Sequence, residues 1–561
     1  MQTGKTTLRN IFDGTQIFNV PIYQRAYSWG EENLSEFLSD LINQQPNRTY
    51  FLGSYLFHEN GKKGDFKIID IVDGQQRLTT FVIFMRALLL KLEALDSQLA
   101  TQRSIRIFVR DDDVFKIELS NENSSFLHHH ILSDDSTEIP IPKTPSQSLL
   151  LAAKSFFTKE LSELNKEMLE KIFQVVTEAD ILIYVVNEIN QATQIFELLN
   201  DRGKKLTDLE AIKSFLMYSV GLASKNPDQT IITIQQNFGE IYRVIESNQL
   251  VEGDILRYHT LAFEQTGDNP KKHIKKKIKG LLSQESDSSI LIKTIIEYCT
   301  GLKRSFEFYD QINKEKYENS ELSKFFMLGR VGPYYPLLFR IYSEDKSKLN
   351  VILEKLNDFN FKGIAIGFRG KFERTIYNKL WTEGIQGAIK VLDQAIPGNW
   401  WNINNRAIKA LDSKYYYGSV NGNLLKYILV AFENSLRSKL GYPKIGLREY
   451  YSEIEREKLS IEHITAQKAQ VTKFDESFGT TYLHNIGNLV IDNKASNSSK
   501  GNKEGGLKSA YFQQAPIMSQ NQLLSINCDW DSIDSIMDFI SNREILLKDF
   551  ISKELLKDKL P

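Results

Sequence analysis

The sequence predicts an α+β protein built from several domains. Two strand-like runs near the N-terminus lead through a glycine turn into a helix, and a second strand–loop–helix pattern lies near the C-terminus. Between these two regions the periodicity is almost entirely helical. Because 561 residues exceed what one core supports, we expect three domains, at 1–225, 226–395 and 396–561.

The composition excludes several classes of protein. Hydrophobic residues make up 41% and charged residues 25%, as in ordinary globular proteins. The 70 basic and 71 acidic residues nearly cancel, so any surface for nucleic acid must be a local patch. Two cysteines, Cys299 and Cys528, are too few for a disulfide scaffold. Since no apolar signal core and no run of about 18 apolar residues occurs, we expect a cytoplasmic protein with no membrane partner.

The segment "FNVPIYQRAYSWGEENLSEFLSDL" is expected to begin extended and to end in a helix. Pro21 favours an extended residue before it. Ser28 and Glu31 have the spacing of a capping box. Apolar residues then follow at helical intervals: Leu34, Phe37, Leu38 and Leu41.

A hairpin and a helix are predicted next. "TYFLGSYLFHE" and "DFKIIDIV" predict strands joined by the turn-forming segment "NGKKGD", and a helical stripe begins after Gly74. A glycine turn that enters a helix presents backbone N–H groups that can bind an anion. Arg77 opposes the helix dipole there, by ~0.3–1 kcal/mol when exposed, unless a bound phosphate reverses the sign. The alternative is a solvated arginine beside a tight turn.

Residues 100–150 are polar and irregular. Three adjacent histidines, His128, His129 and His130, suggest a metal at first sight. Neighbouring side chains diverge on a helix or strand, however, so we expect a surface loop instead of a metal cage.

The following region predicts one more strand and then helices. "DILIYVV" predicts a strand, and the next helix is ended by Gly203. Thr207 and Glu210 form a second capping box before another helix, and residues 225–395 continue the helical pattern.

A lysine-rich run, "NPKKHIKKKIKG", lies within this helical region. One interpretation is a solvated helix face. The alternative is a patch that contacts DNA phosphates through Lys275, Lys276 and Lys277.

Three N-terminal motifs resemble a known family. "VPIYQRAYSW", "DGQQRLTT" and "FELLNDRGKKLTDLEAIK" follow the order found in the N-terminal domain of GmrSD-type modification-dependent restriction enzymes. The resemblance implies a fold similar to ParB and sulfiredoxin and a pocket that binds and hydrolyses a nucleoside triphosphate, with GTP, UTP, CTP and ATP not distinguished. It assigns this pocket to Tyr23, Gln24, Arg25, Asp73, Gly74, Gln75, Gln76, Arg77, Asn200 and Arg202. For Asn200 and Arg202, ordinary helix-end chemistry before Gly203 is the alternative.

The C-terminal motifs "SIEHITAQ", "LHNIGNLVI" and "NKASNSSKGN" resemble the HNH nuclease of the partner half of GmrSD. The resemblance implies a ββα-metal unit in a helical region. His463 would be the general base, oriented with its loop by Asn488, and Glu462 and Asn497 would hold the metal. Neighbours on a regular strand face opposite sides, so Glu462 and His463 can act together only if the strand is irregular. His484 would either support this site or cap the loop.

The sequence therefore predicts a nucleotide-regulated, metal-dependent endonuclease that cuts foreign or modified phage DNA in antiphage defence. Oxygen ligands such as those of Glu462 and Asn497 suit Mg²⁺ or Mn²⁺. The expected partners are DNA and a nucleoside triphosphate, and a homodimer is an open possibility. Two alternatives remain: a nucleotide-sensing DNA-binding regulator that does not cleave, and an RNA-cutting abortive-infection nuclease.

Overall fold

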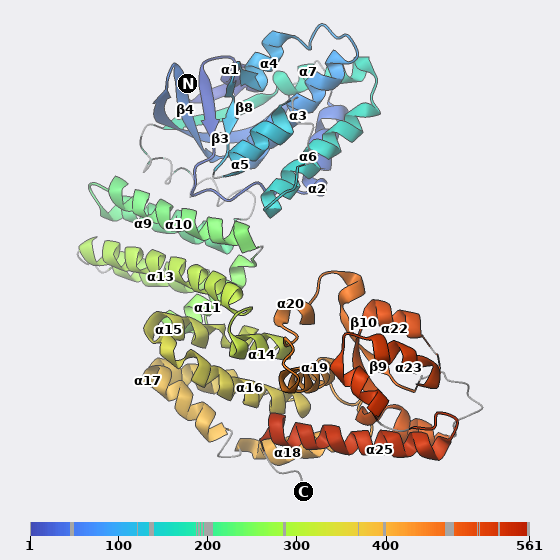
Figure 1. Ribbon diagram of the computed structural model, residues 1–561. Helices are drawn as coiled ribbons and strands as arrows, with labels where there is room; N and C mark the ends of the chain where they lie inside the picture. The colour runs from blue at the N-terminus through green and yellow to red at the C-terminus, as the bar shows by residue number, and fades with distance from the viewer. Residues whose placement is uncertain are drawn as a thin grey trace. The chain divides into compact units, whose positions relative to one another are not determined.

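The computed structural model describes residues 2–557, apart from 45–49, 121, 134–139, 187, 189–190, 192–194, 196–205, 249, 284–287, 369, 396–399, 466–475, 502, 504 and 526–527. The chain divides into two compact units. The first comprises Met1–Thr260 and Thr266–Glu307, and the second Leu261–Gln265 and Phe308–Pro561. Each unit combines helices with a sheet, which confirms the α+β class (Figure 1). The three domain boundaries expected from the sequence stay a prediction.

A mixed six-stranded sheet organises the first unit, in the order β1-β8-β3-β4-β2-β7. Its central hairpin, β3 with β4, is antiparallel, while β8 and β2 run parallel to their inner neighbours β3 and β4. The strands are β1 Gly4–Thr7, β2 Gln16–Asn19, β3 Phe51–Lys63, β4 Phe66–Asp73, β7 Ile117–Glu118 and β8 Asp180–Val186, with a small separate pair, β5 Arg110–Asp111 and β6 Val114–Phe115. The three predicted strands, now β3, β4 and β8, are confirmed.

The predicted hairpin turn is shorter than expected. "NGKKGD" was expected to form the whole connection, but β3 continues to Lys63. The strand register shifts between Glu59 and Lys62, and Gly61, with φ +85°, lies in this irregular part. Pairing resumes where Lys62 lies opposite Lys67. The glycine therefore serves a β-bulge, and the turn itself begins at Gly64.

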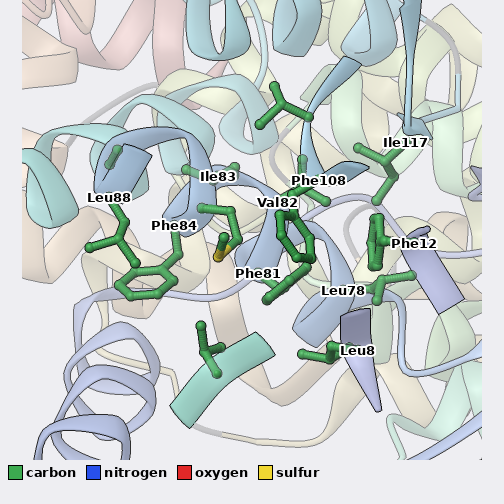
Figure 2. Packing of buried hydrophobic residues seen from close by; sticks show 14 of the residues in the cluster. Leu8, Phe12, Leu78, Phe81, Val82, Ile83, Phe84, Leu88, Phe108 and Ile117 are labelled. Carbon is green, nitrogen blue, oxygen red and sulfur yellow. The ribbon is translucent and has the colours of Figure 1, made fainter. Parts of the chain in front are cut away.

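Helix α3, Gln75–Glu93, forms the centre of the hydrophobic core of this unit. Figure 2 shows its residues Phe81, Val82 and Phe84 packed in a cluster with Phe12 and Phe108. Because α3 is covered by the sheet, α4, α6 and α7, it is apolar around most of its circumference, as a buried helix must be. The remaining helices are α1 Leu8–Phe12, α2 Glu31–Asn43, α4 Gln102–Phe108, α5 Glu122–Phe126, α6 Pro145–Ser162, α7 Lys166–Thr177, α9 Asp208–Ala223, α10 Asp228–Asn248, α11 Glu252–Phe263, α12 Pro270–Ser283 and α13 Ser288–Glu315.

Of the two predicted capping boxes, one is confirmed and one is wrong. Thr207 and Glu210 form both reciprocal bonds at the start of α9. At α2, however, the N-cap is Gly30, because the backbone N–H of Ser28 donates to the Gln76 side chain at 2.8 Å. A long-range contact thus holds Ser28 in an extended segment outside the helix.

The three histidines do not form the expected surface loop. They lie in a π-helical segment, Leu127–Leu132, that follows α5. The His128 ring stacks on Phe115 with a centroid distance of 4.0 Å, and its Nε2 lies 2.8 Å from the Ile117 carbonyl. The partly buried His128 therefore has a packing role, while His129 is exposed.

The second unit is mainly helical and carries one antiparallel strand pair, β9 Leu459–His463 and β10 Leu489–Asn493. Helix α22, Lys494–Lys500, follows β10 directly, and α23, Gly505–Gln514, comes next. The predicted strand and final helix are confirmed, but the polar segment expected as a loop between them forms α22. Alternate residues of β10 enter two hydrophobic clusters, one containing Leu489 and Ile491 and the other Val490. The other helices are α14 Ser320–Leu328, α15 Tyr335–Glu344, α16 Leu349–Ala365, α17 Phe372–Ala395, α18 Ile403–Leu411, α19 Gly422–Lys439, α20 Leu447–Tyr450, α21 Glu476–Phe478, α23 Gly505–Gln514, α24 Met518–Asn521 and α25 Ile533–Phe550. Among the described residues, no helix is both long and apolar enough to cross a membrane.

Candidate functional site

A left-handed turn at Gly74 joins β4 to α3. Gly74 has φ +94°, and a Cβ there would lie 2.4 Å from the Cδ1 atom of Tyr55, so the position requires glycine. The expected glycine turn is therefore confirmed. Asp73 ends β4 beside it, and burial raises the pKa of its carboxyl, against the opposite effect of the nearby Arg77.

The two glutamines after this turn hold an earlier segment of the chain. The Gln75 amide donates to the carbonyl of Arg25, and the Gln76 amide donates to the carbonyl of Ala26, both at 3.1 Å. Gln76 also accepts the N–H of Ser28. The first two motifs are thus brought together at the N-terminus of α3, and their role in a nucleotide pocket stays a prediction.

Arg77 lies against the backbone of β3. Its guanidinium donates to the carbonyls of Leu52, at 2.9 Å, and Ser54, at 3.0 Å, and lies 5.0 Å from the Tyr55 ring centroid. It fills the space beside Gly53, where a Cβ would lie 1.7 Å from Nη1. The alternative of a solvated arginine is therefore wrong, and the role of Arg77 toward phosphate stays a prediction.

A buried lysine, Lys213 of α9, lies next to the predicted pocket residue Tyr23. Its ammonium donates to the Tyr23 carbonyl at 2.7 Å and lies between the rings of Tyr23 and Tyr242, at 5.5 and 5.3 Å from their centroids. Burial lowers the pKa of Lys213 to about 8. The hydroxyls of both tyrosines are buried and find no hydrogen-bond partner in the described part of the chain.

Sequence analysis did not identify Lys213. A signal was nonetheless present, because Lys213 falls on the face of α9 that also carries Leu209 and Leu216, both fully buried. A lysine within an apolar stripe is buried only when it has a specific partner.

Two other predicted pocket residues, Gln24 and Arg25, hold their own segment of the chain against β4 and α9. Gln24 donates to a backbone carbonyl of β4 at 2.8 Å, and Arg25 forms an ion pair with Glu210 at 3.2 Å. Glu210 therefore both caps α9 and anchors Arg25. The predicted Asn200 and Arg202 lie outside the described residues.

The lysine run forms one face of α12. Ile274 and Ile278 are buried on the opposite face, whereas Lys276 and Lys277 are exposed. Lys275 lies over the Phe215 ring, 4.9 Å from its centroid, and is half-buried. The helix is therefore amphipathic, and contact with DNA stays a prediction for Lys275, Lys276 and Lys277.

In the second unit, His463 ends strand β9 beside another histidine. Its Nε2 lies 3.3 Å from Nδ1 of His484, and the exposed ring of Tyr417 lies 4.6 Å from its ring centroid. Burial lowers the pKa of His463 to about 3, and the neighbouring His484 and Lys508 act in the same direction. The imidazole is therefore neutral at physiological pH.

Asn488 connects the two segments that border His463. Its Oδ1 accepts the N–H of Thr465 at 2.8 Å, and its Nδ2 donates to the carbonyls of Leu483, at 2.8 Å, and Thr465, at 3.3 Å. The side chain is fully buried. Asn488 therefore holds the loop after β9, and its orienting role toward His463 stays a prediction.

Glu462 and His463 face opposite sides of β9, as regular strand geometry dictates. Glu462 is buried and forms an ion pair with Lys508 of α23 at 2.5 Å. The same ammonium donates to the His463 carbonyl at 2.7 Å. A cation thus already lies beside the carboxylate that was expected to hold a metal, and sequence analysis did not identify Lys508.

Asn497 of α22 contacts strand β9 through its side chain. Its amide nitrogen donates to Oγ of Ser460 at 3.0 Å and to the carbonyl of Ile461 at 3.2 Å. In the described part of the chain, no group of three or more His, Cys, Asp or Glu side chains is arranged to hold a metal. Carboxylate and amide oxygens are ligand types that Mg²⁺ takes, and metal binding by Glu462 and Asn497 stays a prediction.

Helix α25 supports the turn that presents Asn488. The buried Arg543 donates to the carbonyls of Gly487, at 2.8 Å, and Leu489, at 2.7 Å. A Cβ at Gly487 would lie 2.1 Å from the Ile540 carbonyl oxygen, so the turn requires glycine in order to approach α25. The glycine of "NIGNL" is therefore explained by packing.

Comparison with known families gives two matches. The model of the GmrSD restriction endonuclease N-terminal domain matches residues 8–217, which contain the turn at Gly74 and Lys213. The model of the GmrSD restriction endonuclease C-terminal domain matches residues 402–545, which contain β9, β10 and α22. No curated protein matches the chain.

Proposed function

Because the chain belongs to the GmrSD family of restriction endonucleases, we propose that it is a nucleotide-regulated, metal-dependent enzyme that cuts foreign or modified DNA. The family membership implies a modification-dependent restriction endonuclease. To this activity the proposal adds which residues cut the DNA, that cleavage requires a metal ion, and that a nucleoside triphosphate controls cleavage.

We assign cleavage to a ββα-metal unit of the HNH type, made of β9, β10 and α22. The observation that carries this assignment is the position of His463, which ends the first strand and has its Nε2 3.3 Å from Nδ1 of His484. Neutrality allows His463 to take a proton from the attacking water. Asn488 keeps the loop after β9 in place, and His484 positions the imidazole from its other side.

Glu462 and Asn497 would hold Mg²⁺ or Mn²⁺, which would supply charge stabilisation at the leaving oxygen. Because Glu462 and His463 are neighbours on a regular strand, their joint action requires the end of β9 to leave regular strand geometry when the metal binds. In this arrangement Lys508 gives up its contact with Glu462 and keeps its contact with the His463 carbonyl. The buried position of Glu462 favours such an exchange of cations, because an unpaired carboxylate there is costly.

We assign the nucleotide to a ParB/sulfiredoxin-like domain in the first unit. The phosphates of the nucleotide would contact the backbone N–H groups after Gly74, together with Arg25 and Lys213. The unpartnered hydroxyls of Tyr23 and Tyr242 support this placement, since a ligand or water would satisfy them.

A DNA-cleavage assay tests the proposal. Modified and unmodified phage DNA are incubated with the purified full-length protein, each with and without Mg²⁺ and with and without each nucleoside triphosphate. We expect cleavage of modified DNA only in the presence of Mg²⁺ or Mn²⁺, at a rate that depends on one of the nucleotides. Binding of DNA without any cleavage would favour a regulator, and cleavage of RNA alone would favour an abortive-infection nuclease.

A further inference from the structure

Two exposed tyrosines of one loop lie beside the histidine pair of the second unit. The centroid of the Tyr417 ring lies 4.6 Å from that of His463. The centroid of the Tyr415 ring lies 4.8 Å from that of His484. Tyr415 and Tyr417 are 42% and 37% exposed. Two large aromatic rings are therefore accessible next to the proposed general base.

Tyr416, between these two residues, anchors the loop. It is fully buried, and its hydroxyl donates to the Leu411 carbonyl. The backbone N–H groups of Tyr416 and Tyr417 donate to the His484 carbonyl, at 2.8 and 3.1 Å. The loop is thus bonded to the residue that carries one of the two imidazoles.

The turn after Tyr417 fixes the position of the Tyr415 ring. Gly418 has φ +99°, and a Cβ there would lie 3.4 Å from Cε1 of Tyr415. The Ser419 hydroxyl donates to the Tyr415 carbonyl. Because these contacts already order the loop, a ligand that binds the rings loses less free energy to ordering than one that binds a flexible loop.

Support of the histidines alone does not explain the exposure of the two rings. The Tyr417 ring is nearly parallel to the His484 ring, at 14° and 5.7 Å between centroids, so it can hold that imidazole in place. A ring that only supports a neighbour gains most when the rest of its apolar surface is buried as well. Here more than a third of each tyrosine stays in contact with solvent. The accessible surface is therefore suited to a further partner.

The chemistry of the proposed cleavage site identifies this partner. The nucleotides that flank a phosphodiester attacked at His463 would lie beside the two rings. A base that stacks on an aromatic side chain gains roughly 5–150-fold in affinity, and every base has a suitable face. Within a duplex, neighbouring base pairs cover these faces, so only an unpaired or extruded base can stack on a tyrosine.

We propose that Tyr415 and Tyr417 form a stacking platform for an unpaired or extruded base of the DNA strand that is cut. The proposal rests on the cleavage site proposed at His463. The two rings bind the base and thereby hold the flanking phosphate at the imidazole, and they take no part in proton transfer.

Binding of single strands with and without bases tests the platform. An end-labelled oligothymidylate of about 16 nucleotides and an abasic strand of equal length are titrated with the full-length protein in the presence of EDTA, and fluorescence anisotropy gives both dissociation constants. The variants are Tyr415→Ala, Tyr417→Ala, Tyr417→Phe and Tyr442→Ala. Tyr442 is an exposed tyrosine in the loop after α19 and serves as the matched control. Circular dichroism and thermal melting show that each variant is folded.

Wild type should bind oligothymidylate at least about fivefold more tightly than the abasic strand, because the platform requires a base. Tyr415→Ala and Tyr417→Ala should each remove most of this preference. Tyr417→Phe keeps the ring and should keep the preference, as should Tyr442→Ala.

Equal binding of the two strands by wild type, or a preference that survives in both alanine variants, would overturn the proposal. Slower DNA cleavage by Tyr417→Ala with an unchanged base preference would also overturn it, since the ring would then only support the histidines. Base-dependent binding of oligouridylate RNA but not of oligothymidylate would assign the rings to RNA and refute the DNA platform. If the alanine variants lose the preference but wild type cuts no DNA, the platform is supported and the cleavage site at His463 is wrong.

Discussion

Arg77→Ala should lower the free energy of unfolding of the first unit by roughly 2–4 kcal/mol. Arg77 donates to the carbonyls of Leu52 and Ser54, and each hydrogen bond to a charged group contributes about 1.5–3 kcal/mol. The two bonds together amount to roughly 3–6 kcal/mol, and we reduce this figure because the half-buried carbonyls can regain water. Arg77→Lys should recover only part of the loss, since a lysine cannot reach both carbonyls with a planar fork.

Urea unfolding monitored by circular dichroism measures this effect, with Arg304→Ala as an exposed control expected to change stability by less than about 0.5 kcal/mol. Gly53 supplies an independent check. In wild type, Gly53→Ala places a Cβ 1.7 Å from Arg77 Nη1 at φ +124°, so both a clash and backbone strain result. In the Arg77→Ala background the clash disappears and only the strain, about 1–3 kcal/mol, remains. A double-mutant cycle that shows no coupling between the two positions, or an Arg77→Ala variant as stable as wild type, would refute this account of Arg77 and Gly53.

Four further predictions follow from the described contacts. His463→Ala should slow DNA cleavage ~10²–10⁴-fold in a plasmid assay while nucleotide hydrolysis continues, because a general base is lost; near wild-type cleavage would place the base elsewhere. Nucleotide affinity should fall as the pH rises through about 8, where the buried Lys213 loses its charge, and Lys213→Arg should remove this dependence. A wild-type affinity that does not change between about pH 7 and 9.5 would contradict the prediction. Replacing the exposed Lys276 and Lys277 with Ser should reduce the slope of log K against log salt for duplex DNA by up to ~0.9 per lost contact, and an unchanged slope would indicate a solvated helix face. Gly487→Ala should lower the melting temperature through a destabilisation of at least about 1–3 kcal/mol, because its Cβ would meet the Ile540 carbonyl; an unchanged melting temperature would show that α25 can move.

The pH effect on stability at Lys213 has a definite sign. Its folded pKa, about 8, lies below the ordinary value of 10.5, so the folded state binds fewer protons than the unfolded state between these values. Burial of the charged form therefore costs free energy below pH 8, and this contribution diminishes as the pH rises from 8 to 10.5.

Local sequence patterns predicted those parts of the fold that local contacts determine. The β3–β4 hairpin, the turn at Gly74 and the capping box at Thr207 depend on periodicity and on backbone constraints of single residues. Ser28 failed as an N-cap because Gln76, 48 residues later, binds its N–H. A pattern within a short window contains no information on such a partner.

Sequence motifs predicted those residues of the candidate sites that lie within the motifs. They did not predict the residues that reach these sites only through packing of the folded chain. The motifs located His463 and Asn488 within the matched C-terminal region, but they did not indicate that Tyr417 and Lys508 lie beside β9. Lys213 reaches Tyr23 across 190 residues, so only the folded chain shows the contact. For His484 both interpretations apply, because its ring lies beside His463 and its carbonyl accepts the N–H of Tyr417.

The ion pair between Glu462 and Lys508 has a practical consequence for the stored enzyme. The carboxylate already has a cation that is covalently part of the chain, so the strand pair does not depend on dissolved metal to remain folded. Chelators should therefore leave the protein intact, in contrast to small zinc domains that unfold when their metal is removed. At the proposed metal site, the exchange of the Lys508 ammonium for a divalent ion would activate a nuclease that is already folded.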